Sequence, residues 1–178
     1  MKLIILDRDG VINEDSDDYI KTVDEWLPIP GSLQAMGKLC QAGYTLVVAT
    51  NQSGISRGYF DLPTLHAMHS KMGKLLEQYG GEVDAIFFCP HSPDDKCECR
   101  KPRDGMLRDI GVRYQVNLNG IPLIGDSLGD IQSARSVGAK PMLVRTGKGE
   151  RTLSKHVTEL NGVPVYKNLA EAVSAILA

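Results

Sequence analysis

The sequence predicts an α/β fold in which a central parallel sheet lies between two layers of helices. Two observations support this fold. Short apolar runs recur along the chain, and the segments between them carry apolar residues at the three- and four-residue spacing of amphipathic helices. Strands that alternate with helices in this way form parallel sheets with both faces covered. At 178 residues the chain is expected to form a single domain over residues 1–178.

The strands are expected where the apolar runs are short and end in polar or glycine-containing sequence. These runs are Leu3–Leu6, Thr45–Ala49, Ala85–Phe88, Pro122–Ile124 and Met142–Val144. Two stretches, residues 11–30 and 89–105, fit neither a strand nor a helix pattern. Both follow predicted strands, so we expect them to overhang the edge of the sheet at which ligands bind in such folds.

Helices are expected where apolar residues form a stripe on one face, and packing against the sheet is the interpretation of each stripe. The stripes are Leu33, Met36, Leu39 and Cys40; Leu65, Met68, Met72, Leu75 and Leu76; Met106, Ile110 and Tyr114; Ile131, Ala134 and Val137; and a last helix over Leu169–Leu177. His66 and His69 lie three residues apart on the second of these helices, and we interpret them as surface or core-edge residues.

The composition is that of an ordinary globular protein, with 42% hydrophobic and 24% charged residues and a net charge of −2. Without a basic excess, a nucleic acid is not an expected partner. The apolar runs are shorter than the roughly 18 residues that a membrane helix needs, and the first one is too short for a signal peptide. We therefore expect a cytoplasmic protein that does not bind membranes. A monomer is also expected, although neither composition nor run length specifies it.

Carboxylates gather at the predicted ends of two strands. Asp7 and Asp9 follow the first strand, and Asp126 follows the fourth. If these strand ends are adjacent, the cluster requires a cation, and hard oxygen ligands suit Mg²⁺. Aspartates at strand ends also cap helices, and for Asp130 this reading and a functional one are equally open. Asp7 and Asp9 are too close in sequence to cap one helix together, so we expect a magnesium site.

Two further stretches suit a phosphate group. Thr50-Asn51-Gln52-Ser53-Gly54 ends the second strand with hydroxyl and amide donors and a glycine that permits close backbone approach. Arg100-Lys101-Pro102 places two cations side by side, of which lysine is a compact charge and arginine a bidentate fork. Together with the carboxylates, these stretches predict a phosphate-handling site.

A cysteine-rich loop precedes these cations. Cys89, His91, Cys97 and Cys99 lie within eleven residues, and three thiolates with one imidazole suit tetrahedral Zn²⁺. Four protein ligands leave no open position, so we expect a structural zinc within residues 89–103 that holds Arg100 and Lys101 in place. The alternative is a set of unbound surface thiols. Cys40, on a helical stripe, is interpreted as a small buried hydrophobic residue.

The motifs resemble those of the haloacid dehalogenase (HAD) superfamily of phosphohydrolases. The resemblance lies in Asp7-Arg8-Asp9-Gly10-Val11, Thr50-Asn51, Lys101 and Gly125-Asp126-Ser127-Leu128-Gly129-Asp130. It implies a Rossmann-like three-layer sandwich, and no stretch between the motifs is long enough for a cap domain.

The same resemblance implies the role of each motif residue. Asp7 would attack phosphorus and Asp9 would act as general acid and then base. Mg²⁺ would be held by the Asp7 side chain, the Asp9 carbonyl and Asp126. Thr50 and Lys101 would hold the phosphoryl oxygens. A second aspartate two residues after the first also favours phosphatases over dehalogenases, because a halide leaving group needs no proton.

The zinc loop resembles one branch of that superfamily, which contains sugar-bisphosphate and histidinol-phosphate phosphatases. The resemblance implies that substrate contacts come from Asn13, Asp15, Asn51, Gln52, Ser53 and Arg100. It favours a heptose bisphosphate that loses its C7 phosphate on the route to nucleotide-activated heptose, with histidinol phosphate as the alternative. A polynucleotide 3′-phosphatase is disfavoured by the absence of a basic excess. A zinc-stabilised binding module without activity remains the alternative of another class.

Overall fold

The computed structural model describes all residues, 1–178, and is built on a six-stranded parallel sheet with the order β3-β2-β1-β4-β5-β6. The strands are β1 (Lys2–Leu6), β2 (Tyr44–Asn51), β3 (Ala85–Cys89), β4 (Pro122–Gly125), β5 (Lys140–Val144) and β6 (Val165–Tyr166). The five predicted strands are confirmed. The sixth was not predicted, because its two residues are too few to form a recognisable apolar run.

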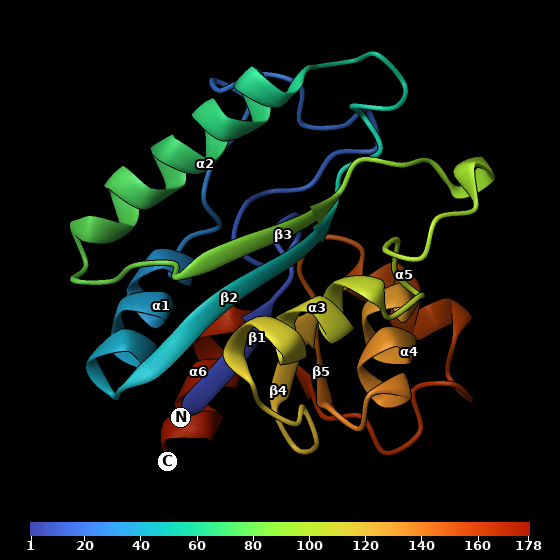
Figure 1. Cartoon of the computed structure of the whole chain (residues 1–178). Helices are drawn as coiled ribbons and strands as arrows, with labels where there is room; N and C mark the ends of the chain where they lie inside the picture. The colour runs from blue at the N-terminus through green and yellow to red at the C-terminus, as the bar shows by residue number, and fades with distance from the viewer.

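Helices cover both faces of the sheet, which confirms the predicted three-layer architecture (Figure 1). They are α1 (Ser32–Gln41), α2 (Leu62–Glu77), α3 (Gly105–Tyr114), α4 (Leu128–Ser136), α5 (Gly149–Lys155) and α6 (Leu169–Leu177), with a 3₁₀ turn at Pro93–Asp95. The short helix α5 is the one that the apolar stripes did not predict.

The alternation of side chains along β1 divides the core between the two faces. Ile4 and Leu6 pack with α1, α2 and α6, whereas Leu3 and Ile5 pack with α3 and α4. All four side chains are buried. The continuous apolar run of this strand follows from its central place in the sheet, because a strand covered on both sides needs apolar residues at every position.

The strand order also determines where the polar motifs meet. Since β1 lies between β2 and β4, Leu6 is in register with Val48 on one side and with Ile124 on the other. The residues that follow these three strands therefore leave the sheet at the same edge. None of the helices combines the length and the hydrophobicity that a membrane-spanning helix needs.

Candidate functional site

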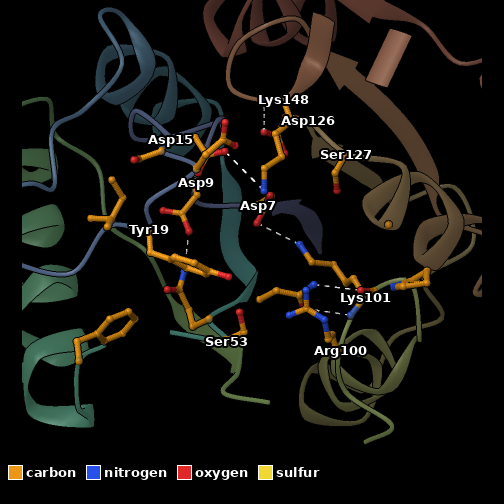
Figure 2. A pocket seen from close by; sticks show the side chains of 18 residues that line it. Asp7, Asp9, Asp15, Tyr19, Ser53, Arg100, Lys101, Asp126, Ser127 and Lys148 are labelled. Atoms are coloured by element: carbon orange, nitrogen blue, oxygen red, sulfur yellow. Dashed lines mark hydrogen bonds and ion pairs between the residues drawn. The ribbon is translucent and has the colours of Figure 1, made fainter. Parts of the chain in front are cut away.

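A cavity of about 380 Å³ opens at the carboxyl edge of β1, β2 and β4 (Figure 2). Asp7 comes from the end of β1 and Asp126 from the end of β4, and the backbone N–H of Asp7 donates to the carbonyl of Ile124 across the two strands. Carboxylate oxygens of Asp7, Asp126 and Asp130 lie within 4.8 Å of one another. The predicted meeting of Asp7 and Asp126 is therefore what the strand order produces.

Close backbone packing gives Asp126 its place. The backbone N–H of Lys148 donates to Asp126 Oδ2 at 2.8 Å. Gly10 and Gly147 have positive φ angles of 82° and 59°. A Cβ on Gly10 would lie 2.0 Å from Asp126 Oδ2, and one on Gly147 would lie 2.3 Å from it. Glycine is required at both positions for the first and the last loops of the site to approach this carboxylate.

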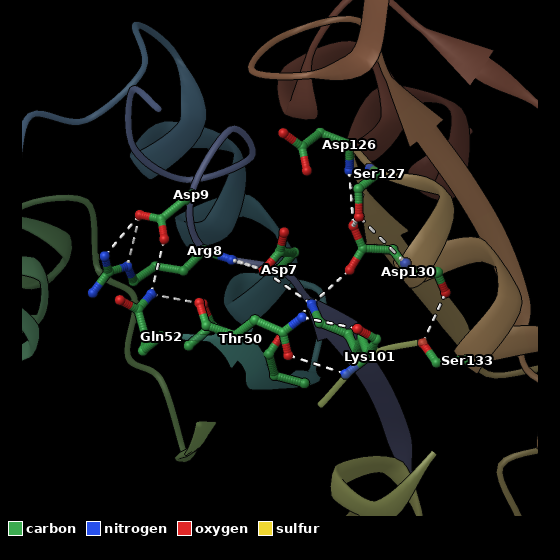
Figure 3. Close-up of polar contacts among 12 residues, drawn as sticks. Asp7, Arg8, Asp9, Thr50, Gln52, Lys101, Asp126, Ser127, Asp130 and Ser133 are labelled. Atoms are coloured by element: carbon green, nitrogen blue, oxygen red, sulfur yellow. Dashed lines mark hydrogen bonds and ion pairs between the residues drawn. The ribbon is translucent and has the colours of Figure 1, made fainter. Parts of the chain in front are cut away.

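Lys101 is the cation at the centre of the carboxylates (Figure 3). Its Nζ lies 3.1 Å from Asp7 Oδ1, 2.6 Å from Asp130 Oδ1 and 2.7 Å from the carbonyl oxygen of Ala49. Asn51 holds the backbone of this lysine, since its side chain accepts from the Lys101 N–H at 3.0 Å and donates to the Lys101 carbonyl at 3.1 Å. Lys101 is thus fixed at both its backbone and its ammonium group.

The two carboxylate oxygens of Asp130, at the N-terminus of α4, bind different partners. Its Oδ2 accepts from the backbone N–H of Ser127 at 3.1 Å, and the hydroxyl of Ser127 accepts from the N–H of Asp130, which is a capping box. Its Oδ1 binds Lys101. The capping interpretation of Asp130 is therefore confirmed, and the same side chain also links helix α4 to the ammonium group of Lys101.

Asp9 is held by three side chains. Its Oδ1 accepts from Arg8 Nη2 at 2.7 Å and from Asn13 Nδ2 at 2.9 Å. Its Oδ2 accepts from Gln52 Nε2 at 2.8 Å. Burial alone would raise the pKa of Asp9, but the positive charge of Arg8 and these hydrogen bonds lower it. These hydrogen bonds also fix the orientation of the Asp9 carboxyl group.

The other two carboxyl groups have the opposite tendency. Burial raises the pKa of Asp7 to about 7, and the charge of Asp130 adds to this effect while Lys101 opposes it. Burial and the charges of Asp7 and Asp130 raise the pKa of Asp126 well above its ordinary value. One lysine therefore does not neutralise the cluster, and an additional cation among these oxygens would relieve the repulsion.

The excess of negative charge agrees with the expected magnesium site, and the residues present fit such a metal ion. Oxygen donors from Asp7 and Asp126 lie close together in a buried, net-negative pocket, which suits a hard cation. Asp130 belongs to the same group of oxygens, but both its oxygens are already bound by Lys101 and Ser127. Asp7 and Asp126 are therefore the side chains available to a metal ion.

The predicted site residues separate into two groups. Most of them line the cavity: Asp7, Asp9, Asp15, Asn51, Gln52, Ser53, Arg100, Lys101 and Asp126. Asn13 and Thr50 do not; they are 0% and 1% exposed. Asn13 contacts Asp9, and the hydroxyl of Thr50 accepts from Gln52 at 2.9 Å. We expected Asn13 to contact the substrate and Thr50 to contact the phosphate. The structure instead places both side chains behind the cavity wall.

Several residues of the cavity wall are not among the predicted site residues, and Tyr19 and Lys148 are two of them. Tyr19 lines the cavity with a φ angle of 68°, and its ring packs 5.1 Å from that of Tyr59. Lys148 also lines it, and its Nζ lies 3.8 Å from Asp15 Oδ2. Their positions depend on contacts between distant loops, and the only sequence signal was the pair of glycines on either side of Lys148.

The predicted zinc ligands converge in the loop after β3. Cys89 Sγ lies 3.6 Å from Cys97 Sγ and 2.9 Å from Cys99 Sγ. His91 Nδ1 lies 3.3 Å from Cys99 Sγ and 3.5 Å from Cys89 Sγ. The four donors, all within 4.8 Å of one another, form the closed set that tetrahedral zinc requires. Arg100 lies against this loop and donates to the carbonyl of His91 at 3.3 Å.

Comparisons with known proteins point in one direction. A family model described as HAD-hydrolase-like matches residues 98–172. The chain is 58% identical over 175 residues to the D-glycero-beta-D-manno-heptose-1,7-bisphosphate 7-phosphatase of Pseudomonas aeruginosa, covering 98% of this chain and 97% of that one. A relative of the same name from Neisseria meningitidis is 57% identical over 160 residues, covering 90% of this chain and 86% of the relative.

Solved structures agree with the sequence relatives. The crystal structure of a D,D-heptose 1,7-bisphosphate phosphatase from Bordetella bronchiseptica, complexed with magnesium and phosphate, has a TM-score of 0.97 and 55% identity. The match covers 99% of this chain and 98% of that chain. The corresponding enzyme from Burkholderia thailandensis has a TM-score of 0.77 and 41% identity, with 100% of this chain and 99% of that chain covered.

Proposed function

This chain belongs to the HAD-like family of D-glycero-beta-D-manno-heptose-1,7-bisphosphate 7-phosphatases and is a phosphatase, and we propose that its own substrate is D-glycero-D-manno-heptose 1,7-bisphosphate, hydrolysed at C7. The relatives confirm the predicted family and HAD-like fold. The proposal for the substrate is supported by the identity over nearly the whole chain. We also propose that the enzyme is a monomer in the cytoplasm and that its reaction helps to supply nucleotide-activated heptose.

The observation that carries the proposed chemistry is the convergence of Asp7, Asp9 and Lys101 at one cavity. In the first step an oxygen of Asp7 forms a bond to the C7 phosphorus, and the bond from phosphorus to the sugar oxygen breaks. A protonated Asp9 donates its proton to the departing alkoxide. In the second step water attacks the phosphorus of the aspartyl-phosphate and Asp9 takes a proton from that water. The bond from phosphorus to the Asp7 oxygen breaks, which releases inorganic phosphate and the free Asp7 carboxylate.

Lys101 supports both steps from the same position. Its Nζ is 3.1 Å from Asp7 Oδ1, so it can donate to a phosphoryl oxygen as charge develops next to Asp7. Asn51 holds this lysine in position, because its side chain binds both the N–H and the carbonyl of Lys101. We propose that Thr50 and Asn13 act indirectly, by orienting Gln52 and Asp9.

Magnesium belongs to this proposal. The side chains of Asp7 and Asp126 and the carbonyl of Asp9 would hold it, which agrees with the magnesium and phosphate bound to the Bordetella bronchiseptica relative. When bound, Mg²⁺ would neutralise charge on the phosphoryl oxygens. We further propose that Cys89, His91, Cys97 and Cys99 hold a structural Zn²⁺.

A bisphosphate requires a second cationic position at the other end of the sugar. Arg100 lies on the cavity wall next to the cysteine loop, and its guanidinium can bind a phosphate by two hydrogen bonds. Lys148 and Asp15 line the same cavity from loops other than the one that carries Arg100. We propose that Arg100 binds the C1 phosphate, while Asp15, Gln52 and Ser53 contact the sugar.

The test is phosphate release from the heptose bisphosphate, histidinol phosphate and fructose bisphosphate in the presence of Mg²⁺. We expect the highest kcat/KM for the heptose bisphosphate, and loss of activity in Asp7→Asn. Asp109→Asn, which changes an exposed aspartate on α3, is the matched control and should remain active. A preference for histidinol phosphate would overturn the substrate proposal, and an active Asp7→Asn enzyme would overturn the mechanism.

A further inference from the structure

We propose that His69 of α2 is a positioning residue that acts through Arg8 to hold the general acid Asp9; this inference rests on the proposed function. The contact is direct in its first half, since His69 Nε2 lies 3.2 Å from Arg8 Nη1. Its second half is the ion pair of Arg8 with Asp9, at 2.7 Å between Nη2 and Oδ1. Neither His69 nor Arg8 lines the cavity.

Arg8 is a buried charge whose donors must all find acceptors. Its side chain is 0% exposed. Nε and Nη2 donate to Asp9 Oδ1, while Nη1 faces His69 Nε2 and, at 3.8 Å, the sulfur of Met68. A thioether is a weak acceptor, so His69 is the principal partner of Nη1. Removing it would leave a buried guanidinium N–H without an adequate acceptor.

The geometry fixes the chemical state of His69. A guanidinium group only donates hydrogen bonds, so Nε2 of His69 must accept and the ring proton must lie on Nδ1. Burial and the adjacent charge of Arg8 lower the pKa of His69 to about 3, which agrees with a neutral ring. The histidine therefore serves as an uncharged acceptor that leaves the full charge of Arg8 to Asp9.

This arrangement makes the two oxygens of Asp9 unequal (Figure 3). Oδ1 accepts from Arg8 Nε, from Arg8 Nη2 and from Asn13, so its acceptor positions are filled. Oδ2 accepts only from Gln52. Asp9 also lines the cavity. We therefore assign Oδ2 as the oxygen that carries the proton, and Oδ1 as the anchored one.

The consequence is that helix α2 contributes to the orientation of Asp9. Met68, which contacts Arg8, is 0% exposed and packs in the core beneath the sheet. The helix therefore offers Arg8 a fixed partner on the side away from Asp9. If Arg8 Nη1 loses His69 as its acceptor, the guanidinium is expected to change its hydrogen bonding. A small rotation of Asp9 would then weaken proton transfer to the leaving group.

The test compares two leaving groups in His69→Leu, which removes the acceptor, and in His69→Gln, which keeps an amide oxygen. kcat/KM is measured with the heptose bisphosphate, whose alkoxide needs a proton, and with p-nitrophenyl phosphate, whose phenolate does not. We expect His69→Leu to lower kcat/KM about tenfold for the sugar phosphate and less than about threefold for the aryl phosphate. His69→Gln should restore most of the loss.

Two further variants separate this inference from the proposed function. Asp9→Asn should show the same leaving-group dependence more strongly, and His66→Leu, on an exposed position of the same helix, should behave as wild type. If Asp9→Asn shows the dependence and His69→Leu does not, the positioning role is overturned while the mechanism stands. Equal losses for both substrates, or an equal loss in His69→Gln, also overturn it. No dependence in Asp9→Asn overturns the acid role itself.

Discussion

The ammonium group of Lys101 lies 2.6 Å from Oδ1 of Asp130, and both side chains are buried. Burial by itself would lower the pKa of Lys101, but the charges of Asp130 and Asp7 raise it above its ordinary value. Lys101 therefore stays charged, and it joins the N-terminus of α4 to the carboxylate expected to attack phosphorus. A single ion pair couples the stability of the domain to the geometry of the site.

Replacing this lysine should damage both properties. Lys101→Met leaves Asp130 and Asp7 buried without their cation, and breaking such a pair costs roughly 3–5 kcal/mol of unfolding free energy. We expect kcat/KM to fall by about 10²-fold or more, because a donor to the phosphoryl oxygens is lost. Urea unfolding and phosphate release measure the two effects. Lys96→Met, an exposed position of the preceding loop, should change neither; a fully active Lys101→Met enzyme would contradict the role of Lys101.

A glycine substitution can separate backbone strain from damage to the metal site. Gly147→Ala would place a methyl group 2.3 Å from Asp126 Oδ2 and 2.4 Å from the Cα of Gly10. Gly162 also has a positive φ angle, of 79°, but has no atom within 4 Å of the added methyl group. Gly162→Ala should therefore cost only about 1 kcal/mol of stability.

For Gly147→Ala we expect a larger loss of stability and a weaker dependence on Mg²⁺. The measurement is activity as a function of Mg²⁺ concentration, together with thermal unfolding. The apparent Mg²⁺ affinity should fall by about tenfold or more, because disturbed ligand support typically costs that much. An unchanged Mg²⁺ titration would argue against Asp126 as a metal ligand.

The cysteine loop should contain about one zinc ion per chain. Cys97→Ser should lose this zinc, lower the melting temperature and reduce kcat/KM, since Arg100 and Lys101 follow the loop directly. Elemental analysis of the purified protein and phosphate release are the measurements. Cys40→Ser is the control, because Cys40 lies outside the cluster, near the carbonyl of Glu82. Protein that contains no zinc and is fully active would exclude the structural zinc.

His69 also predicts a pH dependence of stability. Its pKa is lowered to about 3 by burial and by the charge of Arg8, against 6.5 for the ordinary value, so below about pH 6.5 the unfolded chain binds a proton that the folded chain does not. Stability is therefore complete above this pH and falls as the pH drops toward 3, by up to about 1.4 kcal/mol per unit.

The variant His69→Gln cannot titrate and should lack this component. Between pH 7 and pH 5 the wild type should lose up to about 2 kcal/mol of unfolding free energy relative to His69→Gln. Urea unfolding followed by the fluorescence of the buried Trp26 provides the measurement. His66→Gln, on an exposed position of α2, should follow the wild type. Parallel pH profiles for all three proteins would mean that the pKa of His69 is the same in the folded and the unfolded chain.

Much of the fold was predictable because its signals are local. A strand buried on both faces must be apolar at each position, as Leu3–Leu6 are, and a covering helix must show the spacing of Leu65, Met68 and Met72. The two-residue strand β6 and the short helix α5 were missed because such elements are too brief to produce a period.

The residue types and their spacing were enough to predict the chemistry of this protein. The spacing of Asp7 and Asp9 and the set of Cys89, His91, Cys97 and Cys99 identify donor types, and donor types are a property of the residues. Which of these polar side chains face the cavity depends on how the loops pack in the folded protein. Asn13 and Thr50 lie behind Asp9 and Gln52, whereas Tyr19 and Lys148 reach the wall. The physical reason is that a side chain's direction depends on packing between loops far apart in sequence, such as the contact of Gly10 with Gly147.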